Sequence, residues 1–304
     1  MTGETGNTCQ RKGIILAGGS GTRLWPITAA VSKQLLPVWD KPMIYYPLAT
    51  LMLSGLREIL VISTPNDLPK FQLLLGNGSD FGISLHYAEQ RKPNGIAEAM
   101  IIAENFLEGQ SSALILGDNI FHGHGLQDLL IKTVRRNNTT IFASEVHDPE
   151  RYGVIGFDQQ FKANSIEEKP DQPKSKFAAT GLYFYDKKAP ELAKKLKPSA
   201  RGELEITDLN RLYMQSEELT VELLDRGTTW LDTGTVASLM QAGQFVEAIQ
   251  TRQGTVIACL EEIALDQEWI NHSALEKRIP KLGTGLYAEY IRRLLKKDSN
   301  PDEI

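Results

Sequence analysis

The chain has 304 residues with a formal net charge of -5, and 41% of its residues are hydrophobic while 23% are charged. This composition is typical of a globular protein, and the length allows two domains or one large α/β domain with additions. The acidic balance excludes the broad basic surface of a nucleic-acid-binding protein, so any phosphate site has to be local. No stretch approaches the roughly 18 apolar residues of a membrane span.

The N-terminal segment and the two cysteines favour a cytoplasmic protein. The first eleven residues are polar and glycine-rich, without the apolar core of a signal peptide. The two cysteines are Cys9, in this polar leader, and Cys259, in an apolar strand-like run. They suggest neither a disulfide framework nor a metal knuckle. We expect a cytoplasmic protein without a membrane partner.

Apolar runs rich in β-formers alternate with helical patterns over the first half of the chain. The predicted strands are 14–17, 58–63, 83–88, 113–116 and 140–146, and the predicted helices are 42–54, 67–75, 96–107 and 126–135. Continuous apolar strands that alternate with helices predict an α/β fold with a doubly wound, mostly parallel, Rossmann-like sheet. Ligands in such folds bind at the carboxyl ends of the strands.

After residue 150 the pattern changes. Three consecutive strand-like runs, 152–157, 161–169 and 177–185, predict an antiparallel insertion over about 151–185 that forms a wall beside the site. Further predicted elements are helices at 189–196 and 205–215, a strand at 219–224 and a helix at 235–251. We therefore divide the chain into a leader (1–11), an α/β domain (12–252) and a mainly helical C-terminal extension (253–304), which we interpret as packing or oligomer surface.

The segment from Gly13 to Leu24, GIILAGGSGTRL, is the most informative local feature. A buried-strand run leads into a glycine turn, and Arg23 follows directly. Glycines allow the backbone N–H groups to approach an anion, and the guanidinium supplies a planar set of donors. The segment lacks the ending of a P-loop and the G-x-G-x-x-G spacing, so a tight turn beside a surface arginine stays an alternative.

Four more segments carry charged residues at positions that suit a phosphate site. Lys33 follows the glycine turn, Asp118 ends a predicted strand, Glu168 and Lys169 end a strand of the insertion, and Asp232 precedes a helix. Each has a simpler reading: the aspartates could cap helices, and the other charges could be solvated. The combination of two acids for Mg²⁺, three cations for phosphates and a glycine loop favours a shared site.

Motifs for other chemistries are weak or missing. His122 and His124 resemble a metal pair, but the sequence nearby does not complete a zinc ligand set, which favours a polar turn. The sequence contains neither a G-x-S-x-G elbow nor an H-E-x-x-H helix, so serine hydrolase and zinc peptidase readings lose their usual support.

Taken together, these ordered blocks resemble the signature of the sugar-1-phosphate nucleotidylyltransferases, and among them the glucose-1-phosphate thymidylyltransferases. The resemblance runs from about Lys12 into the C-terminal region. It rests on residues 18–24 (GGSGTRL), 33–37 (KQLLP), 40–47 (DKPMIYYP), 117–121 (GDNIF), 167–170 (EEKP), 202–208 (GELEITD) and 230–235 (WLDTGT). The chain departs from the usual family pattern at Ile96, Glu98 and His122.

The resemblance implies a role for each matching residue. Arg23, Lys33, Asp118 and Lys169 would be catalytic, and Asp118 and Asp232 would hold Mg²⁺. The nucleotide would be bound by Leu16, Gly18, Gly19, Gly21, Thr22, Arg23, Gln34, Gln90, Gly95 and Asp118. The sugar phosphate would be bound by Asn119, Gly153, Glu168, Lys169, Thr180 and Gly181.

The implied reaction joins dTTP and α-D-glucose 1-phosphate to give dTDP-glucose and pyrophosphate, the entry to dTDP-rhamnose and related deoxysugars. A homotetramer with dTDP-sugars as products and candidate regulators is also implied. Three alternatives stay open: another nucleotide or sugar specificity such as UTP, a noncatalytic sugar-nucleotide sensor, and a glycosyltransferase. The presence of Arg23, Lys33 and the acids disfavours the sensor, and the single acid in Gly117-Asp118-Asn119 disfavours the glycosyltransferase.

Overall fold

The computed structural model describes residues 11–19, 21–136 and 138–299, with the side chains of 297–299 excepted. The leader up to residue 10, including Cys9, and Ser20 of the glycine turn lie outside the described residues. Within the described residues, no helix is long and apolar enough to cross a membrane.

The predicted parallel sheet is confirmed as the centre of the fold. Its four parallel strands are β1 (Arg11–Leu16), β4 (Glu58–Ser63), β5 (Ser84–Glu89) and β6 (Ser111–Leu116). They lie in the order β6-β1-β4-β5, so β1 has β4 on one side and the later strand β6 on the other. This arrangement places a topological switch point between β1 and β6.

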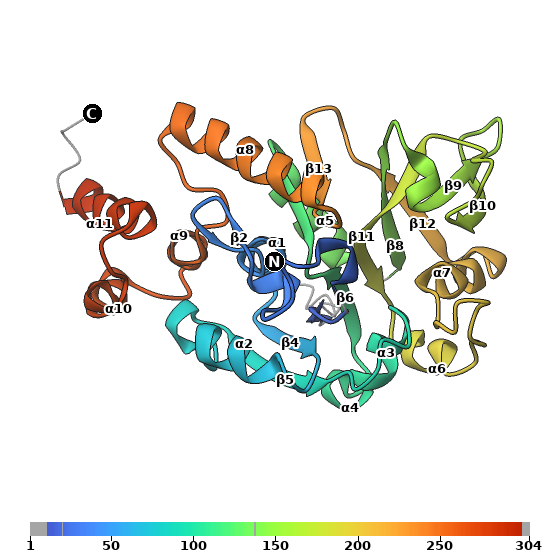
Figure 1. Cartoon of the computed structure of the whole chain (residues 1–304), viewed down its shortest axis with the longest axis horizontal. Helices are drawn as coiled ribbons and strands as arrows, with labels where there is room; N and C mark the ends of the chain where they lie inside the picture. Colours follow the sequence, from blue (N-terminus) through green and yellow to red (C-terminus); the bar gives the residue numbers. More distant parts are fainter. Residues whose placement is uncertain (1–10, 20, 137, 300–304) are drawn as a thin grey trace, which may run out of the picture.

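Helices cover both faces of this sheet, as Figure 1 shows. Because successive strand side chains point to opposite faces, Ile15 joins one core cluster and Ile14 joins the other. The first face packs against α1 (Tyr45–Leu53), α2 (Leu68–Leu75) and α5 (Leu126–Arg135), and the second against α3 (Glu98–Ile102) and α4 (Glu104–Leu107). The predicted helix 96–107 is thus two short consecutive helices.

The predicted antiparallel strands β9 (Gly153–Phe157), β10 (Ala163–Glu168) and β11 (Phe177–Tyr185) are present. β11 also pairs antiparallel with β6, so the third strand of the insertion belongs to the central sheet. β8 (Thr139–Glu145) pairs with β11 and with β12 (Leu219–Leu223). The helices α6 (Ala189–Ala193) and α7 (Ile206–Gln215) pack into the core cluster that contains Ile14. Among the described residues these strands complete one nine-stranded sheet.

Two small two-stranded sheets were not predicted. β7 (Asn119–Gly123) pairs antiparallel with β13 (Thr228–Asp232), and β2 (Pro37–Val38) pairs with β3 (Lys41–Pro42). These strands are short and hold polar and aromatic residues, which hides their period from sequence patterns. α8 (Val236–Gln253) follows β13 and is capped by Thr235, whose side chain forms a capping box with Ser238.

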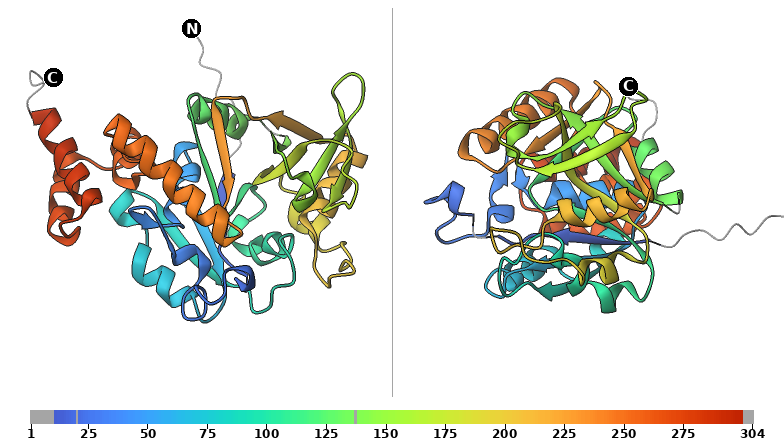
Figure 2. Two further views of the ribbon diagram at one scale, coloured as in Figure 1. Left: turned by 45° about the horizontal axis from the view of Figure 1, so that its top comes forward. Right: turned by 90° about the vertical axis from the view of Figure 1, so that its right-hand side faces the viewer.

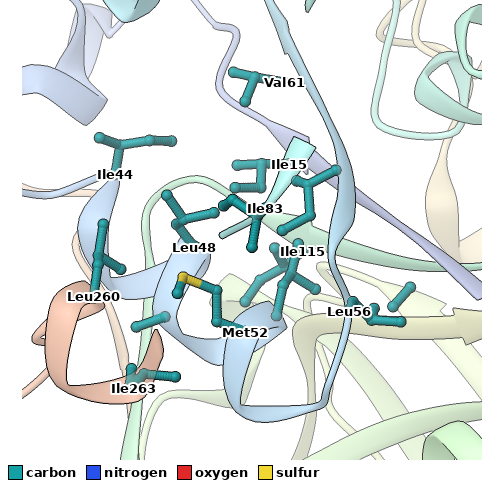
Figure 3. Packing of buried hydrophobic residues seen from close by; sticks show 14 of the residues in the cluster. Ile15, Ile44, Leu48, Met52, Leu56, Val61, Ile83, Ile115, Leu260 and Ile263 are labelled. Atoms are coloured by element: carbon teal, nitrogen blue, oxygen red, sulfur yellow. The ribbon is translucent and has the colours of Figure 1, made fainter. Parts of the chain in front are cut away.

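The C-terminal extension is helical, as predicted, and comprises α9 (Leu260–Asp266), α10 (His272–Arg278) and α11 (Leu286–Ser299). Figure 2 shows α10 and α11 at the opposite end of the molecule from β9 and β10. Figure 3 shows how Leu260 and Ile263 of α9 pack against α1, so the extension shares the main core. Cys259 does not lie in a strand; it is the residue before α9, where the chain turns to enter the helix.

Candidate active site

The glycine turn and Asp118 meet at the switch point of the sheet. β1 and β6 are paired in parallel up to Leu16 opposite Leu116, so the segments that follow them leave the sheet at the same level. The N–H of Gly117 donates to the carbonyl of Leu16 at 2.9 Å. A Cβ on Gly117 would lie 3.1 Å from that carbonyl and 2.9 Å from Gln34, so glycine permits this close approach.

Asp118 and Asp232 lie together because β7 and β13 pair. Asp232 is opposite Asn119 in this antiparallel pair, and both the N–H and the hydroxyl of Thr233 donate to the carbonyl of Asp118, at 3.1 and 2.8 Å. Neither aspartate caps a helix, since Asp118 precedes a strand and Thr235 caps α8. The capping alternative is therefore wrong for both residues.

Lys33 lies against the acidic pair. Its Nζ donates a hydrogen bond to Oδ2 of Asp118, and its side chain is only 8% exposed. Burial by itself would raise the pKa of Asp118, but the ammonium of Lys33 and the amide of Asn119 hold that pKa below its ordinary value. Burial, with the nearby charge of Asp118, raises the pKa of Asp232. The site thus places two carboxyl groups close enough to repel each other, which is the arrangement a divalent cation would relieve.

Asn119 connects three elements at the centre of the site. Its Oδ1 accepts from the N–H of Gly181 at 3.1 Å and from Nε1 of Trp230 at 2.6 Å, and its Nδ2 donates to Oδ1 of Asp118 at 2.9 Å. The residue is 3% exposed. A buried side chain with these three bonds holds a single orientation, so Asn119 fixes the direction in which the Asp118 carboxylate points.

A cavity of about 210 Å³ opens beside the acidic pair and contains most of the predicted sugar side. Of the predicted site residues, those lining it are Arg23, Asp118, Asn119, Gly153, Glu168, Lys169, Gly181 and Asp232. Oε2 of Glu168 accepts from the hydroxyl of Thr207 at 2.5 Å, and Nζ of Lys169 lies 3.4 Å from Oε1 of Glu168. Lys169 has φ of 44°, a left-handed backbone that is uncommon outside glycine, directly after β10.

Arg23 lies on the short 3₁₀ helix Thr22–Leu24 and reaches the same cavity from the glycine turn. A Cβ on Gly234 would lie 3.3 Å from Nη2 of Arg23 and 2.9 Å from Oδ2 of Asp232. Glycine at position 234 therefore leaves room for the cation and the carboxylate side by side. Arg23 is therefore an exposed residue that also lines the cavity beside Asp232.

Several other predicted nucleotide residues are in contact around the glycine turn. Nε2 of Gln34 donates to the carbonyl of Gly18 at 3.2 Å, and Nε2 of Gln90 donates to the carbonyl of Gly95 at 3.1 Å. A Cβ on Gly18 would meet Oε1 of Gln90 at 2.9 Å, so the turn lies directly against Gln90. The unusual Glu98 accepts from Nε2 of Gln90 at 2.8 Å and so orients this amide.

The remaining predicted residues lie near the glycine turn or on β11, and they do not line the first cavity. Gly19 and Gly21 line a separate cavity of about 240 Å³ together with Lys33, and Leu16 ends β1. Thr180 is fully buried, its hydroxyl has no hydrogen-bond partner among the described residues, and it does not line the first cavity, unlike its neighbours Ala179 and Gly181. The structure therefore brings the main chain around Thr180 to the site but not its side chain.

Several residues in or beside the cavity were not predicted. Arg151 lines the cavity, with Nη2 3.7 Å from Oδ2 of Asp232, and the ring of Tyr152 lies tilted against that of Trp230 with ring centroids 5.1 Å apart. Nη2 of Arg201 lies 3.3 Å from Oε1 of Glu168. Trp230 and Arg201 fall in or beside motif blocks, which could have signalled them, but nothing in the local sequence distinguishes Arg151.

The residues present fit a magnesium ion. Mg²⁺ is commonly bound by one or two carboxylates together with phosphate oxygens and water, rather than by a full protein cage. Asp118 and Asp232 supply two such carboxylates in one cavity. No group of three or more His, Cys, Asp or Glu side chains that could hold a metal occurs among the described residues, so His122 and His124 do not form part of one.

Comparisons with known proteins identify the family of this chain. A family model described as nucleotidyl transferase matches residues 12–249. The glucose-1-phosphate thymidylyltransferase of Neisseria meningitidis serogroup A is 56% identical over 287 residues, which cover 94% of this chain and all of that protein. The Mycobacterium tuberculosis H37Rv enzyme of the same name is 50% identical over 287 residues, with the same coverage.

Solved structures lead to the same family. A crystal structure of a Bacillus anthracis protein assigned as a glucose-1-phosphate thymidylyltransferase, in complex with a sucrose, has a TM-score of 0.72 and 41% identity, covering 78% of this chain and 95% of that chain. A UDP-glucose pyrophosphorylase complexed with UDP-glucose shares the fold, with a TM-score of 0.69, 22% identity, and coverage of 79% and 99%. This chain belongs to the nucleotidyl transferase family and, within it, to the glucose-1-phosphate thymidylyltransferases.

Proposed function

We propose that the protein catalyses the reaction of dTTP with α-D-glucose 1-phosphate to give dTDP-glucose and pyrophosphate. The observation that carries the proposal is the arrangement of charges around Asp118 and Asp232. Arg23 reaches this acidic pair from the glycine turn, Lys33 contacts it from the short 3₁₀ helix Lys33–Leu35, and Lys169 lines the same cavity beside Glu168. Two anionic substrates can thus be held on either side of one point.

The chemistry needs little more than this placement. A phosphate monoester has a second pKa near 6, so glucose 1-phosphate is largely a dianion at pH 7 and attacks without a general base. One of its phosphate oxygens forms a bond to the α-phosphorus of dTTP, and the bond from that phosphorus to the oxygen that joins it to the β-phosphorus breaks, so this oxygen leaves as a terminal oxygen of pyrophosphate. The leaving group keeps the electron pair. We infer a direct in-line displacement without a covalent enzyme intermediate.

The side chains of the site have separate tasks in this scheme. Lys169 holds the sugar phosphate, and Glu168 accepts hydrogen bonds from glucose hydroxyls. Arg23 and Lys33 bind the triphosphate and stabilise the charge that develops on pyrophosphate, because fixed cations in a partly buried site stabilise a transition state without reorganisation. Asp118 and Asp232 would hold Mg²⁺, which supplies positive charge that offsets the repulsion between the two anions. We assign contacts with the thymine to Gln90 and Gly95.

The test is a pyrophosphate-release assay with dTTP, UTP, CTP, ATP and GTP against several sugar 1-phosphates, with and without a chelator of Mg²⁺. We expect the highest turnover with dTTP and glucose 1-phosphate, and loss of turnover in the chelator. Asp118→Asn and Asp232→Asn should each lower turnover by about 100-fold or more. Equal or better turnover with another nucleotide would contradict the specificity, and full activity of either variant would contradict the metal assignment.

The stereochemistry at phosphorus tests the displacement itself. With dTTP made chiral by sulfur at the α-phosphorus, one in-line attack inverts the configuration of the product. Retention would reveal two displacements and hence a covalent intermediate.

We further propose a cytoplasmic homotetramer that dTDP-sugars regulate. Family membership supports this, since the chain spans the full length of several of the family's proteins. Light scattering of the purified protein, with turnover measured in the presence of dTDP-sugars, tests both parts. A monomer, or turnover indifferent to dTDP-sugars other than the product, would contradict the corresponding part.

A further inference from the structure

A second cavity lies on the other side of Lys33 from the first one. It has a volume of about 240 Å³ and is lined by Gly19 and Gly21 of the glycine turn, by the segment from Thr28 to Lys33, and by Asn66, Asp67 and Lys70. Lys33 lines this cavity while its Nζ is bonded to Asp118, which lines the first cavity. A linear ligand could therefore run from the acidic pair past Lys33 into the second cavity.

The walls of this cavity are held by specific contacts. The hydroxyl of Thr28 donates to the carbonyl of Gly21 at 2.8 Å, which ties the segment after the glycine turn back onto the turn. On the opposite wall, the segment after β4 leads into α2, and the hydroxyl of Thr64 donates to Oδ2 of Asp67 at 3.0 Å. Both walls are segments that follow parallel strands, β1 and β4, and so lie at the carboxyl edge of the sheet.

Lys70 is the second positively charged residue that lines this cavity, after Lys33. Its Nζ donates to Oδ1 of Asp67 at 2.9 Å and lies 3.5 Å from the carbonyl of Ala30. An ammonium group has three donors, so one remains for a ligand after these two contacts. The side chain is 43% exposed, whereas the Asp67 side chain is 18% exposed and has both oxygens engaged. Asp67 thus holds the lysine stem in place and leaves the ammonium facing the cavity.

We propose that Lys70 binds the terminal phosphates of the nucleoside triphosphate, and hence the departing pyrophosphate, with Lys33 on the other side. This inference rests on the proposed function of the site. A polyanion with four charges needs several cations along its length, and Lys33 is also bonded to Asp118. The sugar side does not compete for this position, because Glu168 and Lys169 line the first cavity.

The experiment compares ligands that differ only in their phosphates. Lys70→Met keeps the length of the stem and removes the charge, Lys70→Gln is a second neutral variant, and Lys70→Arg restores the charge. Lys277→Met on α10 is the matched control, since Lys277 is exposed and lies on the C-terminal extension. Calorimetry gives the Kd of dTMP and dTTP, and the reverse reaction of dTDP-glucose gives the KM of pyrophosphate.

We expect both neutral variants to raise the Kd of dTTP and the KM of pyrophosphate about tenfold, the size of one charge-assisted hydrogen bond at a partly exposed site. The Kd of dTMP should stay unchanged in these variants. The arginine variant and the control should match the wild type. Equal losses for dTMP and dTTP would indicate a merely structural lysine and overturn the inference, as would no loss at all. If the wild-type protein itself fails to convert dTTP, the proposed function fails instead.

Discussion

Replacement of Gly181 by alanine tests the central position of Asn119 in the site. A Cβ on Gly181 would lie 2.5 Å from Oδ1 of Asn119 and 2.6 Å from its Cγ, distances that real Cβ contacts do not show. Asn119 is 3% exposed and has to move, so the N–H of Gly181 and Nε1 of Trp230 lose their acceptor. Each buried donor left without a partner costs roughly 1 to 3 kcal/mol, which gives about 2 to 6 kcal/mol for the pair.

The same displacement should lower activity. Nδ2 of Asn119 orients the carboxylate of Asp118, and a loss of about 1.4 kcal/mol in orientation corresponds to tenfold in kcat/KM. We expect kcat/KM to fall by about 10- to 100-fold. Equilibrium denaturation gives the stability change, and pyrophosphate release gives the rate. Gly285→Ala is the matched control, because a Cβ there would meet nothing within 4 Å.

A double variant shows whether the clash with Asn119 causes the destabilisation. In an Asn119→Ala background the obstructing side chain is gone, so adding Gly181→Ala should cost less than about 0.5 kcal/mol. If Gly181→Ala costs the same in both backgrounds, the clash with Asn119 is not the cause of the destabilisation. If the single variant keeps wild-type stability and activity, the reasoning about Asn119 fails altogether.

Three further predictions concern stability. Arg11→Met should destabilise the fold by more than about 3 kcal/mol in urea denaturation, because its guanidinium donates to the carbonyls of Ser112, Val134, Arg136, Asn138 and Tyr185; a change below 1 kcal/mol would contradict this. Thr235→Ala should cost about 1 kcal/mol through loss of the capping box of α8, with Thr235→Ser near wild type in the same assay. Burial raises the pKa of Tyr45 to about 12, so its contribution to stability is present below pH 10 and is lost as the pH rises from 10 to 12. Tyr45→Phe should leave stability at pH 7 nearly unchanged and reduce the loss over pH 10 to 12 by up to about 2 kcal/mol; an unchanged slope would show that another group titrates.

Much of the fold could be predicted from the sequence because local patterns carried it. Strands such as 58–63 and 113–116 were predicted within a few residues, because burial on both faces of a sheet leaves an uninterrupted apolar run. The helix over 126–135 was predicted from its helical pattern of apolar residues. The glycine turn with Arg23, and the ordered blocks after it, were enough to predict the family. The family assignment is confirmed by the relatives described above.

Only the tertiary structure decided which charged residues meet. Asp118 and Asp232 are 114 positions apart in number, and they adjoin because β7 pairs with β13, two short strands whose pattern is too brief to read. Arg151, Arg201 and Trp230 come to the site through loops and pairings that involve residues far along the chain. The chain by itself determined the strands of the central sheet, most of the helices and the chemical types present at their ends. Strand order and long-range pairing determined their distances, because these depend on the packing of the whole sheet rather than on any local run of residues.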